Sequence, residues 1–270
     1  MVDVIHTTLK VGLEKPVKLL HITDVHLTKY SENDPEEQQA LLQRRYLTFR
    51  REGAEPLLDP EAYFAEAIAM AEEMGATLVV TGDVMDLFSE GNVREFHRIA
   101  AGHDMMFSPG GHETQRICRR TMEEPYPYWV EMRQKLAKAF PEFDLDFESR
   151  VIGGLNVITA NNALDYYNAD TVRRFRRELE RGLPIVVFSH DPLTDSLLNC
   201  TEPYHPNITL TPEDYRISHE MITLLREHPL VKGVFGGHWH VQRDGVLENG
   251  KPTFCTPGLF KGICRLIEVT

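Results

Sequence analysis

The sequence predicts an α/β protein in which strands and helices are stacked in layers. Short apolar segments rich in β-branched residues alternate with longer amphipathic stretches, and this alternation is typical of sheets covered by helices. No internal repeat, low-complexity tract or linker divides the 270 residues. The composition, 42% hydrophobic and 26% charged, is that of an ordinary globular protein able to bury a core. We therefore expect a single domain over residues 1–270.

Local patterns predict the elements of the first half. Residues 17–22 and 77–81 are expected to be buried strands because they are almost continuously apolar. Between them, residues 60–74 carry apolar side chains at helical spacing, and Gly75 is a natural end for that helix. Residues 105–107 form a third candidate strand, which ends at a Ser-Pro-Gly sequence.

The second half continues the alternation. The expected elements are a helix over 128–140, a hairpin over 150–158, a helix over 170–181, a strand over 184–188, a helix over 219–227 and a strand over 231–235. The Gly153-Gly154 pair supplies the turn of the hairpin. Asp170 is the expected N-cap of its helix, which should end at Gly182. The last thirty residues are expected to form further strands.

Charge and cysteine usage exclude several classes of function. The chain has 41 acidic and 29 basic residues, a net charge of −12, which argues against binding to nucleic acid or to anionic membranes. A nuclease stays an alternative because Arg44–Arg51 and Arg173–Arg181 are locally basic. The sequence has no apolar run of about 18 residues and no CxxC pair, and we expect no signal peptide because its first residues lack a basic stretch followed by an apolar segment. We expect a reduced, cytoplasmic protein.

Four of the expected strands run directly into clusters of Asp and His. These polar residues are Asp24, His26, Asp83, His190, His238 and His240. Ligands of α/β sheets bind beyond the carboxyl ends of the strands, so these side chains should meet in one place. Imidazoles together with carboxylates suit Zn, Mn or Fe(II). Two carboxylates and four imidazoles exceed the needs of one ion and approach those of two that share a bridging carboxylate.

The order of these motifs resembles the calcineurin-like metallophosphoesterase family. The matching segments are Asp24-Val25-His26, Gly82-Asp83-Val84-Met85-Asp86, Gly110-Gly111-His112-Glu113, His190 and Gly237-His238-Trp239-His240. The resemblance extends over residues 17–260, nearly the whole chain. It implies a four-layer α/β/β/α sandwich of two mixed sheets.

The resemblance also implies a role for each residue. Asp24, His26 and His240 would hold one divalent ion, His190 and His238 a second, and Asp83 would bridge them. His112 would contact the phosphate and protonate the leaving oxygen, and Glu113 would orient His112. The implied activity is hydrolysis of a small phosphate mono- or diester by a metal-bound hydroxide.

One residue departs from the family pattern. The family has Asn where this chain has Gly111, and that Asn normally binds the second ion and touches the phosphate. Three interpretations are open. The second site is weakened, or Asn161 or Asn162 substitutes, or catalysis is lost and the protein only binds metal and phosphate.

Other segments are candidates for shaping the site. Residues 29–58 are a long charged insertion after the first motif, either a lid or a peripheral element with a helix over 36–51. Residues 193–211 are a second candidate wall of the pocket, with Tyr204 and His205. Arg116, Arg119 and Arg120 would lie on one helix face, as phosphate ligands or as a solvated surface.

Two further residues have expected structural roles. His21, inside an apolar strand, is expected to be a hydrogen-bonded core residue. Asp86 is expected to accept hydrogen bonds next to the metal ligands without binding an ion.

Overall fold

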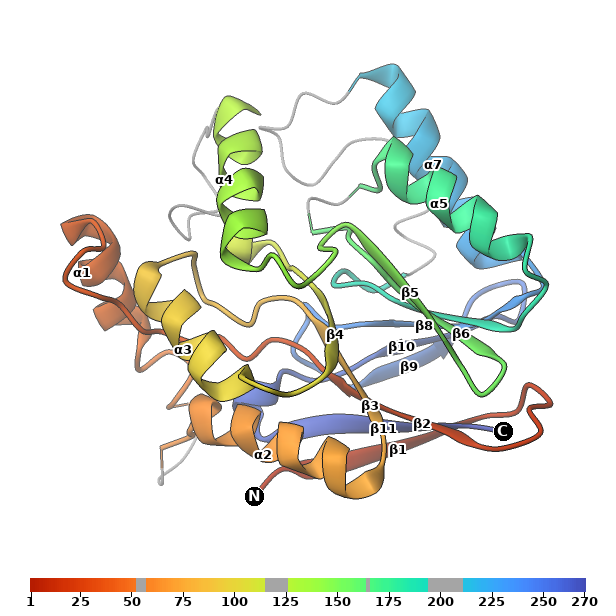
Figure 1. Cartoon of the computed structure of the whole chain (residues 1–270), viewed down its shortest axis with the longest axis horizontal. Helices are drawn as coiled ribbons and strands as arrows, with labels where there is room; N and C mark the ends of the chain where they lie inside the picture. The colour runs from red at the N-terminus through yellow and green to blue at the C-terminus, as the bar shows by residue number, and fades with distance from the viewer. Residues whose placement is uncertain (52–56, 115–125, 164–165, 194–210) are drawn as a thin grey trace.

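Two mixed β-sheets packed face to face form the centre of the molecule (Figure 1). The computed structural model describes residues 1–51, 57–114, 126–163, 166–193 and 211–270, with the side chains of 126–130 excepted. The first sheet has the order β1 (Asp3–Leu9), β11 (Ile263–Val269), β2 (Val17–Ile22), β3 (Thr77–Thr81) and β4 (Met105–Ser108). The second has the order β5 (Phe147–Ile152), β6 (Leu155–Ala160), β7 (Ile185–Phe188), β8 (Val231–Gly236), β10 (Pro252–Cys255) and β9 (Arg243–Val246).

Helices cover the outer faces of both sheets. The first sheet carries α2 (Pro60–Met74) and α3 (Glu90–Ala100), and the second carries α5 (Ala169–Leu179) and α7 (Pro212–Glu227). Two more helices, α1 (Glu36–Arg45) and α4 (Tyr126–Ala139), lie beside the first sheet (Figure 1). The result is the four-layer α/β/β/α sandwich that the family resemblance implies. None of the described helices combines the length and apolar character needed to span a bilayer.

The strands bury both of their faces because their side chains alternate between two cores. In β2, Leu20 and Ile22 pack with the helices of the first outer layer. Leu19 points the opposite way and packs with Val157 and Val186 of the second sheet. Burial on both faces explains why these strands are nearly continuous apolar runs.

Parallel pairing brings the motif-bearing strand ends together. In the first sheet β2, β3 and β4 are mutually parallel, and in the second β6, β7 and β8 are. Backbone hydrogen bonds then join the loops that follow: Asp24 N donates to Gly82 O at 2.9 Å, and Gly237 N donates to His190 O at 2.8 Å. The polar clusters of both sheets therefore lie on the same side of the sandwich.

The expected strands and helices are present, with several differences in their bounds; α7, for example, begins at Pro212 rather than near residue 219. The N-cap of α5 is Asn168 rather than Asp170, because the Asn168 side chain accepts from Thr171 N at 2.9 Å. Helix α1 ends at Arg45 rather than at residue 51, because the chain turns there and buries Phe49 and Arg50. Two elements, β1 and α3, were not predicted, since β1 is defined by pairing with β11 at the far end of the chain.

Candidate metal centre

The six candidate ligands form two groups of three. Each group offers three ligand atoms within 4.8 Å of one another. The members are Asp24, His26 and His240 in the first group, and Asp83, His190 and His238 in the second. Asp83, which the family resemblance implies as a bridge between two ions, is grouped here with His190 and His238. A third group of the same spacing, His26 with Asp86 and His112, overlaps the first.

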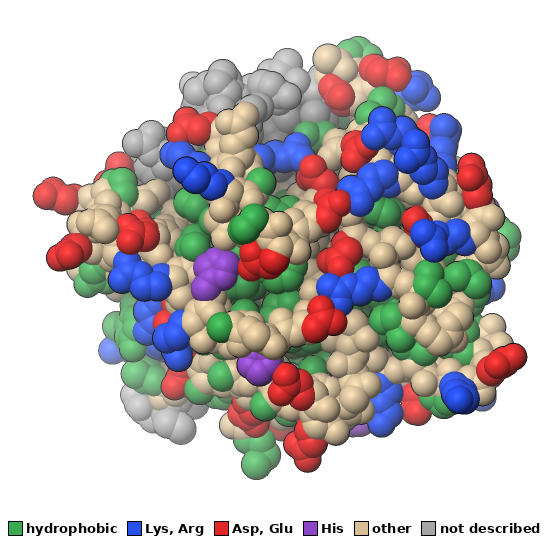
Figure 2. Space-filling model, viewed as in Figure 1, with side chains coloured by type: hydrophobic (Ala, Val, Ile, Leu, Met, Phe, Trp, Pro, Cys, Tyr) green, Lys and Arg blue, Asp and Glu red, His purple; other side chains and the backbone are tan. Residues whose placement is uncertain are grey.

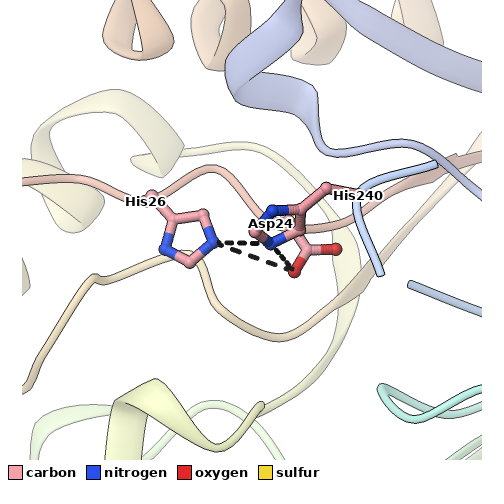
Figure 3. Close-up of side chains that lie close together, drawn as sticks. All are labelled: Asp24, His26 and His240. Atoms are coloured by element: carbon pink, nitrogen blue, oxygen red, sulfur yellow. Dashed lines mark hydrogen bonds and ion pairs between the residues drawn. The ribbon is translucent and has the colours of Figure 1, made fainter. Parts of the chain in front are cut away.

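The first group joins the two sheets (Figure 3). His240 Nε2 lies 3.1 Å from Asp24 Oδ1 and 3.1 Å from His26 Nε2, and His26 Nε2 lies 3.9 Å from Asp24 Oδ1. Asp24 and His26 follow β2, whereas His240 follows β8 of the other sheet. The second group has similar spacing: His190 Nε2 lies 3.2 Å from Asp83 Oδ2 and 3.3 Å from His238 Nδ1.

These spacings fit the binding of one ion in each group. Ligand atoms about 2.1 Å from an ion, at angles of about 90–110°, lie roughly 3.0–3.4 Å apart. Most of the measured separations fall in that range. In addition, the buried Asp24 Oδ1 accepts no hydrogen bond although it faces the imidazole nitrogens. A buried carboxylate oxygen without a donor is costly, and a cation would satisfy it.

The tautomers of two histidines also fit metal binding. His190 Nδ1 lies 2.9 Å from the carbonyl oxygen of Thr81, which can only accept, so Nδ1 carries the proton. His26 Nδ1 lies 3.2 Å from Asp86 Oδ1 and is fixed in the same way. In both rings Nε2 therefore faces the centre. Metal-binding histidines are oriented by this kind of second hydrogen bond.

Five of the six candidate ligands have left-handed backbone conformations. They are Asp24, His26, Asp83, His238 and His240, with φ between 50° and 66°, and they are the non-glycine residues with positive φ in the described part of the chain. This conformation costs an L-residue about 1–2 kcal/mol. Strained backbone that coincides with a cluster of ligand side chains is typical of functional sites.

Glycines allow the loops to approach one another. A Cβ atom at Gly237 would overlap the side chains of Thr23 and Asp24. At Gly110 a Cβ would overlap Asp83 Oδ1. Because neither loop tolerates a side chain, both positions require glycine, and the carboxylates of both groups depend on this close packing.

The centre is strongly polarised. Burial raises the pKa of Asp24, but the neighbouring His240 and His190 outweigh it and lower that pKa to about 2. Burial likewise opposes ionisation of Asp83 and His190, yet each holds the other charged: the pKa of Asp83 is well below its usual range and that of His190 well above. Burial and the charge on His190 lower the pKa of His238 to about 4.

His112 lies beside both groups and is oriented by Asp86. Its Nδ1 is 2.7 Å from Asp86 O and 3.3 Å from Asp86 Oδ1, and its Nε2 is 3.9 Å from Asp83 Oδ2. Asp86 thus accepts hydrogen bonds, as expected. Its side chain is fully buried and also contacts His26.

The Glu113 carboxylate, which the resemblance implies orients His112, accepts hydrogen bonds from backbone N–H groups. The donors are the N–H groups of Asp83 at 2.9 Å, Met85 at 2.8 Å and Gly110 at 2.7 Å. Consecutive residues of a 3₁₀ turn point about 120° apart, so Glu113 faces the buried loops when His112 faces the site. Burial and the charge of Asp83 raise the pKa of Glu113 to about 7.

The side chains of both asparagines proposed to replace the missing family Asn are hydrogen-bonded to other groups. Asn162 donates to Asp191 O at 2.9 Å and accepts from Asp191 N at 3.0 Å, so its amide is engaged there. Asn161 Oδ1 accepts from Ala163 N at 2.9 Å. Gly111 offers only its backbone, and its carbonyl accepts from Thr114 Oγ1 at 2.9 Å. Arg116, Arg119, Arg120, Tyr204 and His205 lie outside the described residues.

Two side chains of the 29–58 segment reach the centre and were not predicted. The Phe49 ring stacks on His26, with ring centroids 4.0 Å apart and an interplanar angle of 4°. Arg45 forms a two-pronged ion pair with Asp86, in which Arg45 Nη2 lies 2.7 Å from Asp86 Oδ1. No local pattern indicates these contacts, because each joins residues far apart in the sequence.

The first of three comparisons with solved structures agrees with the fold. A dimetal phosphatase from Danio rerio superposes with a TM-score of 0.50 at 12% identity, covering 90% of this chain and 88% of that chain. A 5'-nucleotidase from Candida albicans SC5314 gives 0.41 at 13% identity, over 98% of this chain and 46% of that chain. The phosphopantetheinyl hydrolase PptH from Mycobacterium tuberculosis gives 0.42 at 10% identity, over 96% and 88%. Among proteins of curated function, none matches this sequence significantly.

The family assignment follows from the sequence profile described as Calcineurin-like phosphoesterase, which matches residues 17–242. That range contains the whole succession of motifs, from the Asp24 loop to the His240 loop. The chain belongs to the calcineurin-like phosphoesterase family.

Proposed function

We propose that the protein hydrolyses small phosphate mono- or diesters with two divalent metal ions, Mn, Zn or Fe. The observation that carries the proposal is the convergence of two separate groups of three His and Asp ligand atoms. Asp24, His26 and His240 would hold one ion, and Asp83, His190 and His238 the other. When bound, two such ions clamp the oxygens of a transferring phosphoryl group and lower the pKa of water.

His112 is suited to protonate the leaving oxygen. Its Nδ1 faces the backbone carbonyl of Asp86, which can only accept, so Nδ1 keeps its proton in every state of the ring. The proton that the imidazolium can give up is therefore the one on Nε2, the nitrogen that faces Asp83 and the candidate ligands. The Asp86 carboxylate stabilises the charged ring.

Glu113 would serve the reaction by holding the ligand loops. Three N–H groups from two loops converge on its carboxylate, and one of them belongs to Asp83. His112 N in turn donates to Asp83 Oδ1 at 2.9 Å. The two residues that follow Gly111 thus fix both the backbone and the side chain of Asp83.

The surface charge favours a small substrate over a nucleic acid. The basic side chains that gather over α5 are interspersed with acidic ones (Figure 2). Arg173 pairs with Asp170, Arg174 with Asp144, Arg176 with Glu220 and Arg181 with Glu178. Paired arginines release few counterions on binding a phosphate backbone, so this face gives little support to a nuclease.

Hydrolysis of chromogenic esters tests the proposal. We expect the chain to hydrolyse p-nitrophenyl phosphate or its bis ester when Mn²⁺ or Zn²⁺ is present, and to stop when a chelator is added. Asp83→Asn removes a proposed metal ligand. It should therefore lower the rate by more than the roughly 100-fold that is typical when a residue hydrogen-bonded to a ligand is lost. Asp3→Asn, a change at an exposed carboxylate outside both ligand groups, is the matched control. Hydrolysis that persists with chelator, or in Asp83→Asn, would contradict the proposal.

A catalytically impaired protein of the same fold is the second candidate, and Gly111 is the observation in its favour. In that case both groups would still bind metal, but no ester would be hydrolysed at a measurable rate. Gly111→Asn then restores a side chain that can bind the second ion. If the natural sequence hydrolyses no ester and Gly111→Asn does, the natural protein is catalytically impaired by the glycine.

A further inference from the structure

Arg45 lies outside every motif of the candidate centre, yet it is bonded to the residue that orients two of its histidines. Helix α1 ends at Arg45, and the guanidinium meets both carboxylate oxygens of Asp86. The Asp86 side chain is fully buried, and that of Arg45 is 22% exposed. A bidentate pair of this kind fixes the plane of the carboxylate as well as its position.

Asp86 in turn contacts two rings of the centre. Its Oδ1 lies 3.2 Å from His26 Nδ1 and 3.3 Å from His112 Nδ1. The second nitrogen of His26 faces Asp24 and His240, on the opposite side of the ring (Figure 3). The orientation of the Asp86 carboxylate therefore sets the direction in which His26 presents Nε2.

The same segment holds His26 by its face. Phe49, four residues beyond Arg45, is stacked on His26 and is itself 5% exposed. The Arg45 guanidinium lies over the same Phe49 ring, 5.1 Å from its centre. Phe260 packs edge-on against both rings, with its centroid 5.1 Å from that of Phe49 and 5.7 Å from that of His26.

Residues 45–50 are held in a fixed position by contacts with the rest of the protein. The buried Arg50 pairs with Glu61 at the start of α2, and its Nη1 donates to Thr28 Oγ1 at 3.1 Å. Leu58 N donates to Arg50 O at 3.0 Å, which closes the insertion back onto the body of the protein. Residues 45–50 are thus tied both to α2 and to the loop that follows His26.

We propose that Arg45 is a positioning residue of the metal centre, which acts through Asp86 on His26 and His112. Without Arg45 the buried Asp86 carboxylate has fewer hydrogen-bond donors and can rotate. The rings of His26 and His112 are then no longer held in a fixed orientation. Supporting residues of this kind typically contribute 10–100-fold to metal affinity. The inference rests on the proposed metal centre but does not require hydrolysis.

Calorimetric titration of Co²⁺ into the metal-stripped full chain tests this role. We expect Arg45→Ala to weaken Co²⁺ binding about 10- to 100-fold. Arg45→Lys keeps the charge but cannot form the two-pronged pair, so it should restore only part of the affinity. Arg44→Ala, an exposed neighbour on the same helix, is the matched control and should bind Co²⁺ like the natural sequence.

A double-mutant cycle separates action through Asp86 from general damage. In an Asp86→Asn background, Arg45→Ala should cause little further loss, because the carboxylate that it orients is already gone. The proposal would be overturned if Arg45→Ala bound Co²⁺ as tightly as the natural sequence. It would also be overturned if Arg45→Ala lowered the Co²⁺ affinity as much in the Asp86→Asn background as in the natural one. If Arg45→Ala does not fold, the Co²⁺ affinity of Arg45→Lys tests the proposal instead. An Arg45→Lys variant that binds Co²⁺ as tightly as Arg44→Ala would overturn the proposal. Failure of the natural chain to bind Co²⁺ would instead refute the metal centre itself.

Discussion

The backbone at the candidate ligands is held in a conformation that their side chains disfavour. His240 has a φ of 55°, and its side chain is 29% exposed, so it can be replaced without opening the core. Both Gly and Ala remove the imidazole, but only Gly relieves the left-handed backbone. We expect metal-free His240→Gly to be about 1 kcal/mol more stable than His240→Ala, as measured by urea unfolding. In an ordinary loop the Ala variant is the more stable of the two. A His240→Ala variant as stable as His240→Gly, or more stable, would therefore contradict backbone strain at this position.

At the residue scale, the sequence indicates the ligands but not what holds them. Each ligand follows a recognisable strand, and the order of motifs is apparent along the chain. Asp86 was expected to accept hydrogen bonds, yet Arg45 and Phe49 were not connected with the centre. Their contacts depend on where the chain turns after α1, and that turn is set by burial of Arg50 against Glu61. Such long-range packing has no periodic signal.

At the scale of elements, β2 carries a buried histidine that ties the two sheets together. His21 Nδ1 lies 2.8 Å from Thr256 Oγ1, after β10, and Nε2 lies 2.7 Å from Thr81 Oγ1 in β3. Burial, with a contribution from the charge of Arg265, lowers the pKa of His21 to about 3. The ring is therefore neutral in the folded protein, as expected for a hydrogen-bonded core residue.

This shift makes the stability depend on pH in a definite direction. Between about pH 6 and pH 4 the unfolded chain binds a proton at His21 and the folded chain does not, so the free energy of unfolding falls as pH falls. The contribution reaches about 1.4 kcal/mol per pH unit. We expect His21→Gln to show a shallower decline than the natural sequence in urea unfolding from pH 7 to pH 4 with chelator present. Equal slopes would contradict a neutral His21.

The elements themselves were largely predictable because most are defined by local periodicity. Gly75 ends α2 in the left-handed conformation that its position suggested, and Gly153 and Gly154 form the hairpin turn between β5 and β6. The cap of α5 was misplaced by two residues, since Asn168 and Asp170 are both good capping residues and only the structure distinguishes them. Strand β1 was missed because its partner, β11, is the last strand of the chain.

At the scale of the whole molecule, the four-layer sandwich explains why distant segments share one site. The motif-bearing strands of both sheets end on the same side, and the Gly237 loop packs directly on Thr23 and Asp24. The first group draws ligands from both sheets, so the centre lies across the interface between them. The alternation of strand-like and helix-like segments predicts a layered α/β architecture, and the family resemblance implies four layers. The pairing order of the strands came only from the structure.

Anomalous diffraction from crystals grown with Mn²⁺ tests the central claim most directly. Two metal ions are expected, one among Asp24, His26 and His240 and one among Asp83, His190 and His238, with Asp83 close to both. Because Gly111 supplies no side chain, we expect lower occupancy at the second position. Absence of metal from both groups, or ions bound elsewhere in the chain, would contradict the proposed centre.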